Sequence, residues 1–100
     1  MKTKQELVNL GIEGYKADEI MLLQEKMMEQ AVKFQFKKKD GTIRDAVGTL
    51  CREKMIQEDG TLWEPKGDSK PEPATVIRFF DVVKGAWRSF SCIEFIAITA

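Results

Sequence analysis

The side chains in this sequence best suited to chemistry are clustered lysines and scattered carboxylates, and no histidine accompanies them. The 100-residue chain holds 16 Lys plus Arg, 16 Asp plus Glu and no His. Without imidazole, a chain can build no Ser–His or Cys–His dyad, no histidine general base and no His-ligated zinc site. Its two cysteines are too few for a four-thiolate zinc site. We therefore expect that the protein is not an enzyme and binds no metal.

The remaining reactive groups show no catalytic arrangement. Cys51 and Cys92 lie in apolar or strand-like contexts without CxxC spacing, so we expect two reduced, half-buried thiols rather than a disulfide. No pair of carboxylates stands in surroundings that would separate their pKa values, as an acid–base pair requires. The glycines form neither a GxGxxG fingerprint nor a P-loop. The sequence thus predicts no catalytic residue and no cofactor.

Positive charge gathers in one part of the chain. Residues 31–54 hold 7 basic and 3 acidic residues, a net charge of +4, and residues 55–73 hold 2 and 5, a net charge of −3. The formal charge of the whole chain is zero, which argues against indiscriminate polyanion binding, because non-specific affinity for nucleic acid comes mainly from phosphate neutralisation. The local surplus still defines a candidate nucleic-acid contact, made of Lys33, Lys37, Lys38, Lys39 and Arg44.

The first 30 residues read as helical. Thr3 and Glu6 have the spacing of a capping box, which begins a short helix that Gly11 ends. From Tyr15 to Gln30 there is no Gly or Pro, and apolar residues recur at three- and four-residue spacing. We expect one or two helices that pack on the rest of the domain.

At residue 31 the pattern changes from helical to alternating. Val32, Phe34 and Phe36 fall on one face of a predicted strand, and residues 43–50 return as its partner after the Asp40-Gly41 turn. Two registers are open for this hairpin. A two-residue loop would set Phe36 against Asp45, and a three-residue loop with a glycine bulge would set Phe34 against Ala46. We expect the bulge.

The middle of the chain, residues 51–73, is rich in acidic residues, Gly and Pro. A connection of this length between strands is unusual, and such segments are often functional or disordered. We expect Trp63 to hold this segment against the rest of the domain.

Two further strands, 74–83 and 86–92, flank Lys84-Gly85, and a two-residue turn there would pair Asp81 with Arg88. The opposite face of these strands carries Phe80, Val82 and Trp87, so another part of the protein must cover it. Residues 93–98 form a last apolar strand.

The elements together predict a mostly β (α+β) fold, with five strands after one or two N-terminal helices. We expect a helical segment at 1–30 that packs on a β domain at 31–100, with a long loop at 51–73. No stretch approaches the ~20 apolar residues of a membrane span, and the N-terminus lacks the apolar region of a signal peptide. We expect a cytoplasmic protein with no membrane partner.

The sequence resembles a known family at three places: Phe34-Gln-Phe36-Lys-Lys-Lys-Asp40-Gly41-Thr42-Ile43-Arg44, Gly48-Thr49, and Phe80-Asp81 followed by Trp87-Arg88-Ser89-Phe90. These residues resemble the Sm-like, SH3-type β-barrel proteins grouped as a second WYL-like family, which occur in gut anaerobes, their phages and mobile elements. The Trp-Tyr-Leu tripeptide of the better known WYL ligand-sensing domains is missing here. The resemblance implies that residues 31–100 form a five-stranded SH3/Sm-like barrel and, since the family has no established activity, it implies no site.

Two functions of different class follow from these residues. The first is a non-enzymatic interaction module that binds a protein or another copy of itself through Trp63, Phe80, Val82 and Trp87. The alternative is a nucleic-acid-binding barrel that uses the basic 33–44 hairpin, because small barrels of the Sm and OB type bind nucleic acid with such strands and loops. The competing structural explanation is that the lysines keep a sheet edge soluble. A phage or mobile-element inhibitor of a host protein is a variant of the first function.

Overall fold

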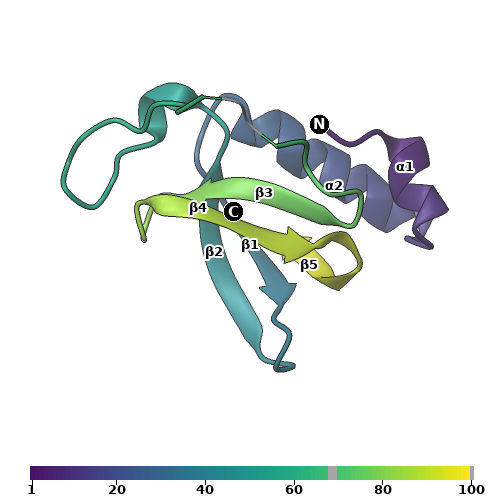
Figure 1. The fold of residues 1–100 in the computed structure, drawn as a ribbon. Coiled ribbons are helices and arrows are strands. Elements are labelled where there is room, and N and C mark those ends of the chain that lie inside the picture. The colour runs from purple at the N-terminus through teal and green to yellow at the C-terminus, as the bar shows by residue number, and fades with distance from the viewer. Residues whose placement is uncertain (68–69, 100) are drawn as a thin grey trace.

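Two helices precede a five-stranded antiparallel sheet (Figure 1), in a computed structural model that describes residues 1–67 and 70–99. The helices are α1 (Lys4–Asn9) and α2 (Gly14–Met27), with short 3₁₀ turns η1 (Arg52–Lys54) and η2 (Cys92–Glu94). The strands are β1 (Val32–Lys37), β2 (Ile43–Thr49), β3 (Val76–Asp81), β4 (Ala86–Ser91) and β5 (Phe95–Ile98). The strand order is β4-β3-β2-β1-β5. The predicted fold class is confirmed.

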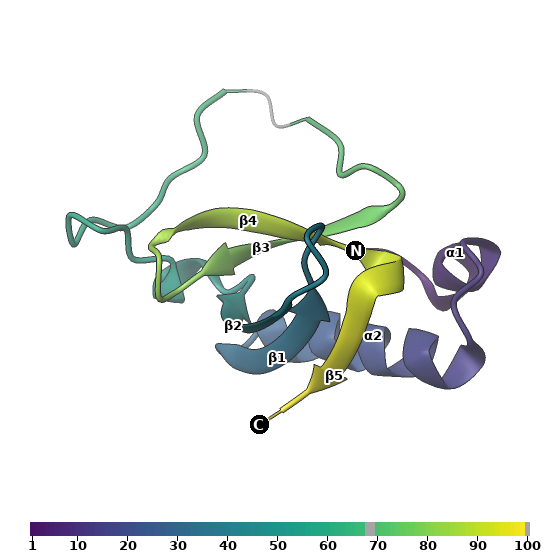
Figure 2. The same cartoon turned by 90° about the horizontal axis from the view of Figure 1, so that it is seen from below.

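The helices begin as their sequence predicts. The Thr3 hydroxyl accepts a hydrogen bond from the Glu6 amide (3.2 Å), and Glu6 Oε1 accepts one from the Thr3 amide (3.3 Å), which completes the capping box. Helix α2 buries a stripe that includes Ile20, Leu23 and Met27 and packs against β1 and β5. Figure 2 shows the helix running beneath these strands. In the described part of the chain, no helix combines the length and the hydropathy that a membrane crossing requires.

Five phenylalanines form the centre of the core. Each is at most 5% exposed: Phe34, Phe36, Phe79, Phe90 and Phe95. The rings of Phe36 and Phe90 stack with centroids 5.2 Å apart, and Phe34 meets Phe79 edge-on at 5.1 Å. Gly48 makes this packing possible, since a Cβ there would lie 2.6 Å from a ring carbon of Phe79.

The β1–β2 hairpin has the register of a three-residue loop with a glycine bulge. Phe34 lies opposite Ala46. The Lys38 amide donates to the Thr42 carbonyl (2.8 Å), and Gly41 has a φ of +88°, the left-handed conformation that a bulge glycine takes. The expected register is confirmed.

The same turn chemistry recurs in the 51–73 segment, where no strand pairing was expected. The Asp-Gly-Thr sequence of the first hairpin is repeated at 59–61. Asp59 Oδ1 accepts hydrogen bonds from the amide (3.0 Å) and the hydroxyl (2.6 Å) of Thr61. An isolated β-bridge between Ile56 and Leu62 flanks this turn. The described part of the segment therefore contains a small second hairpin.

The predicted register of the β3–β4 hairpin is wrong by two residues. Asp81 lies opposite Ala86 and Phe79 opposite Arg88, so the loop spans 82–85. The Asp81 carboxylate explains the longer loop, because it accepts two backbone N–H donors inside it, each at 3.0 Å. A shift by an even number of residues leaves each side chain on its predicted face.

Candidate functional site

A groove of about 740 Å³ lies between the tip of the β1–β2 hairpin and strand β4. Five basic side chains line the groove, against two acidic ones, Asp40 and Glu94. The basic residues are Lys37, Lys38, Lys39, Arg44 and Arg88. We call this surface the basic groove.

The basic groove brings together most of the predicted nucleic-acid contact and adds one residue to it. Lys33 does not line the groove; it lies at the other end of β1, where its carbonyl accepts a hydrogen bond from the Thr99 amide (2.9 Å). Arg88 was missed, because its segment has little net charge. The sequence did indicate the face on which Arg88 lies, because Arg88 stands two residues before Phe90 and so projects from the same face of β4.

Arg44 is held by the protein itself. Its guanidinium is ion-paired with the buried carboxylate of Asp81 and lies 6.0 Å from the centroid of the Phe36 ring. The predicted pair of Asp81 with Arg88 does not form, because the hairpin register places these residues two positions apart. The lysines and Arg88 are therefore the groove cations that Asp81 does not offset.

The carboxylate of Asp40 accepts hydrogen bonds from within its own loop. Its Oδ1 accepts hydrogen bonds from the hydroxyl (2.7 Å) and the amide (3.0 Å) of Thr42. These bonds, first the one from the hydroxyl, lower the pKa of the Asp40 carboxyl, which also lies near the Lys38 charge. Asp40 is thus an ionised structural group of the loop tip rather than an acid or base for chemistry.

The groove is suited to phosphate groups rather than to aromatic stacking. Lysine and arginine supply cationic donors, and Ser89 and Ser91 add hydroxyl groups along β4. The two aromatic residues in the lining, Phe36 and Phe90, are 5% and 3% exposed and belong to the core. The arrangement can neutralise a phosphodiester backbone, but it offers no exposed ring to a base.

The predicted protein-contact residues lie on the other side of the sheet, and the protein itself covers much of their surface. Phe80 is completely buried, so it offers no surface to a protein partner, and its prediction as a protein contact is wrong. Trp63 packs edge-on against Trp87 with ring centroids 5.2 Å apart, and Trp87 meets Phe80 at 5.9 Å. The expected role of Trp63 in pinning the 51–73 segment is confirmed. Val82 is half-buried and donates its amide to the Val47 carbonyl (3.0 Å).

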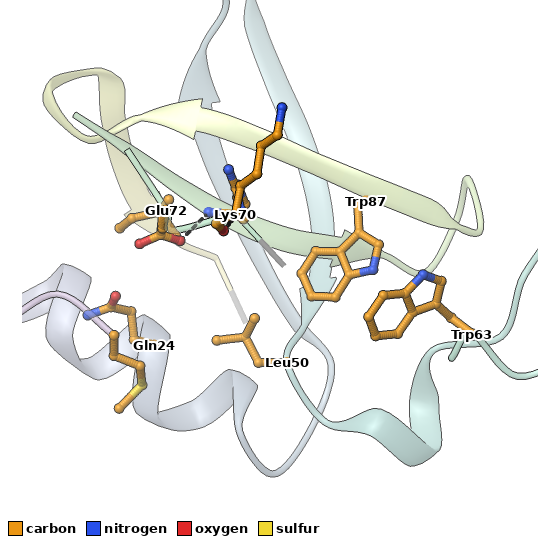
Figure 3. A pocket seen from close by; sticks show the side chains of 9 residues that line it. Gln24, Leu50, Trp63, Lys70, Glu72 and Trp87 are labelled. Carbon is orange, nitrogen blue, oxygen red and sulfur yellow. Dashed lines mark hydrogen bonds between the residues drawn. The ribbon is translucent and has the colours of Figure 1, made fainter. Parts of the chain in front are cut away.

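A second cavity, of about 590 Å³, lies against the Trp87 face (Figure 3). We call it the indole slot. Its lining residues are Met1, Gln24, Leu50, Trp63, Lys70, Glu72, Ile77, Arg78 and Trp87. The slot therefore joins the N-terminus, helix α2, the 51–73 segment and the β3–β4 hairpin.

A buried polar cluster holds one end of the indole slot, and sequence reasoning missed it. The Lys2 ammonium contacts Glu72 Oε1 (2.6 Å) and the Pro73 carbonyl (2.9 Å), although Lys2 is only 4% exposed. The Lys2 amide donates to Gln24 Oε1, and Gln24 Nε2 donates to the Lys2 carbonyl, both at 3.0 Å. The available signal was Gln24, a polar residue on the apolar stripe of α2.

The cysteines are free thiols, as expected. Cys51 is half-buried and Cys92 is buried, and burial raises the pKa of the Cys92 thiol. Such a thiol is a poor nucleophile. Across residues 1–67 and 70–99, no group of three or more Cys, Asp or Glu side chains is placed to hold a metal ion.

Comparison with known proteins agrees with this architecture. Residues 20–96 match the family model described as WYL_2, Sm-like SH3 beta-barrel fold. An uncharacterized 11.5 kDa protein from the Gp31-cd intergenic region of Enterobacteria phage T4 is 39% identical over 64 residues, which is 63% of this chain and 60% of that protein. The match thus spans less than two thirds of the phage protein, and no solved structure matches the chain. The expected family and its phage association are confirmed: the chain belongs to the WYL_2 family of Sm-like, SH3-type β-barrel proteins.

Proposed function

We propose that this protein is a non-enzymatic, nucleic-acid-binding barrel that holds the backbone of a single strand in the basic groove. One observation carries the proposal. The fold brings Arg88 of β4 next to the hairpin cations Lys37, Lys38, Lys39 and Arg44, so that five basic side chains line one groove. If the lysines served only to keep the hairpin tip soluble, there would be no reason for Arg88 of a second strand to lie beside them.

The shape of the groove favours one strand over a duplex. Small barrels bind single strands with a positively charged groove that follows the backbone. Here the groove runs between a hairpin tip and an edge strand, and the unequal lining of five basic and two acidic residues provides the phosphate contacts. We expect the protein to act in the cytoplasm.

The first of the two expected functions, a protein-binding or self-associating module, loses support because the Trp87 face is partly covered. Phe80 is buried, and Trp63 covers part of the Trp87 surface, which reduces the apolar area left for a protein partner. The phage relative is uncharacterized and favours neither function.

A salt-dependent binding experiment with a charge-reversal pair tests the proposal. A labelled single-stranded oligonucleotide of about 16 nucleotides covers the site sizes known for small barrels. Four phosphate contacts would give a slope of about −3 for log affinity against log salt concentration, since each contributes about −0.7 on a single strand. Fluorescence anisotropy measures both affinity and slope.

The matched variants are Lys37→Glu plus Lys39→Glu in the groove and Lys33→Glu plus Lys54→Glu outside it. Both pairs change the net charge equally, and all four side chains are exposed. The groove pair should abolish binding, and the outside pair should weaken it only slightly. Equal weakening by the two pairs, or no binding by the unmodified protein at low salt, would show that the basic groove is not the site.

A further inference from the structure

The indole slot and the basic groove lie on opposite faces of one strand. Trp87 lines the slot and its neighbour Arg88 lines the groove, because successive side chains of a strand point to opposite faces. Strand β4 stands at the end of the sheet order, and within the described chain only β3 pairs with it. A strand of nucleic acid lying along this edge would therefore reach both surfaces.

The slot offers what the groove lacks, an accessible aromatic surface. Trp63 and Trp87 are half-buried, whereas the groove phenylalanines belong to the core. Figure 3 shows the six-membered ring of Trp87 directed into the cavity and its nitrogen edge turned toward Trp63. Leu50 and the buried Ile77 complete the apolar part of the lining. The Trp87 ring and the apolar lining suit a flat ligand that can stack on the indole.

Two polar side chains of the slot wall, Arg78 and Glu72, are engaged by the protein, whereas the buried Trp87 Nε1 has no hydrogen-bond partner among the described residues. Arg78 donates to the carbonyls of Lys70 (2.9 Å) and Pro71 (3.3 Å). The Glu72 carboxylate accepts from the Lys2 ammonium (2.6 Å) and the Arg78 amide (2.8 Å). These contacts fix the side chains of Arg78 and Glu72 in the wall of the slot. The slot volume of about 590 Å³ also falls in the range of small-molecule sites.

We propose that the indole slot is a nucleobase site, in which a base of the strand held by the basic groove stacks on Trp87. The inference rests on the proposed function and adds the chemical class of ligand for a second surface. Stacking on an indole tolerates every base, because each base has a π-face. Binding is therefore expected to be largely independent of base sequence and to depend on the presence of bases.

The chain contains its own reporters for this site. Trp63 and Trp87 are its two tryptophans, and both line the slot. The probes are a single-stranded oligothymidylate and an abasic oligonucleotide of the same length, which carries the same phosphates without bases. The oligothymidylate should quench tryptophan fluorescence and bind about tenfold more tightly than the abasic strand, as one stacked base predicts. The variant Trp63→Phe should retain the quenching, which assigns it to Trp87.

A slot-filling variant separates the two surfaces. Leu50 lines the slot and not the groove. Leu50→Trp should lower oligothymidylate affinity about tenfold and leave abasic binding unchanged, with the circular dichroism spectrum as a control for folding. Equal binding of both strands without quenching would overturn the nucleobase site and leave the basic groove intact. Binding of neither strand would overturn the proposed function and the nucleobase site together.

Discussion

The carboxylate of Asp81 on β3 pairs with Arg44 on β2 and not with Arg88 on the adjacent strand β4. Asp81 is 1% exposed, and it also accepts the two amides that close the β3–β4 loop. One buried side chain therefore determines the length of a loop and the position of a cation in the basic groove. The pairing links the hairpin that carries the lysines to the strand that carries Arg88.

Removal of the Asp81 carboxylate should lower the stability of the fold. Asp81→Ala leaves Arg44, whose side chain is 23% exposed, without its partner and two loop amides without an acceptor. We expect a loss of about 3 kcal/mol in the free energy of unfolding, measured by urea denaturation. Asp45→Asn is the control, since Asp45 is an exposed carboxylate on β2 and its loss should cost below about 0.5 kcal/mol. Similar midpoints for the two variants would contradict the assigned role of Asp81.

Gly48 should be intolerant of even one methyl group. Its added Cβ would lie 2.6 Å from Phe79 Cδ2 and 3.0 Å from Phe34 Cε1. Gly48→Ala should therefore destabilise the protein by about 1–3 kcal/mol, the range for overpacked cores. Gly14→Ala at the start of α2 meets nothing within 4 Å and should be neutral or stabilising. Thermal denaturation of both variants checks the prediction, and an unchanged melting temperature for Gly48→Ala would refute it.

The two lysine–carboxylate pairs near the N-terminus should differ in strength. Lys2 is 4% exposed in its pair with Glu72, whereas Lys4 and Asp18 are 54% and 62% exposed in theirs. Lys2→Met should cost about 2 kcal/mol, because it strands a part-buried carboxylate, and Lys4→Met should cost about 0.5 kcal/mol or less.

Hydrogen exchange can locate the effect of Lys2→Met. The amides of Val76 and Arg78 should lose protection in this variant, since they donate to the Pro73 carbonyl and the Glu72 carboxylate, which Lys2 holds. Equal protection of these two amides in the two lysine variants would argue against the anchoring role of Lys2.

The two Asp-Gly-Thr turns should become less stable at acidic pH. Hydrogen bonds from Thr42 and Thr61 lower the pKa values of Asp40 and Asp59 below the ordinary 3.8. A carboxyl whose folded pKa is lowered stabilises the fold above its unfolded pKa, and that contribution is lost as the pH falls through the folded value. Both turns should therefore weaken only below about pH 4.

A single methyl-for-hydroxyl exchange tests the cause of the lowered pKa. Thr42→Val removes the side-chain donor to Asp40, so the Asp40 pKa should rise toward 3.8 in a carboxyl NMR titration. The Asp59 titration should stay unchanged and serves as the internal control. An unchanged Asp40 pKa would show that the Thr42 hydroxyl is not the main cause.

The sequence by itself determined the features that depend on neighbouring residues. Alternation put Phe34 and Phe36 on the core face, and Asp40-Gly41 specified a bulged hairpin because only a few backbone conformations suit that pair. The capping box at Thr3 is local for the same reason. These elements, in order, were enough to predict five strands after N-terminal helices, and the family resemblance added the barrel.

Only the tertiary structure decided where distant residues meet. The β3–β4 register followed from a buried acceptor, Asp81, whose partner Arg44 lies 37 positions away. Trp63 came to lie against Trp87, which packs on the buried Phe80, and the basic groove needed Arg88 to come beside the lysine hairpin. Which distant residues come into contact depends on strand pairing, long-range contacts and burial, and local periodicity does not encode these. The sequence therefore determined which side chains of a strand face the core, and the packing of the barrel decided which charged side chains share a groove.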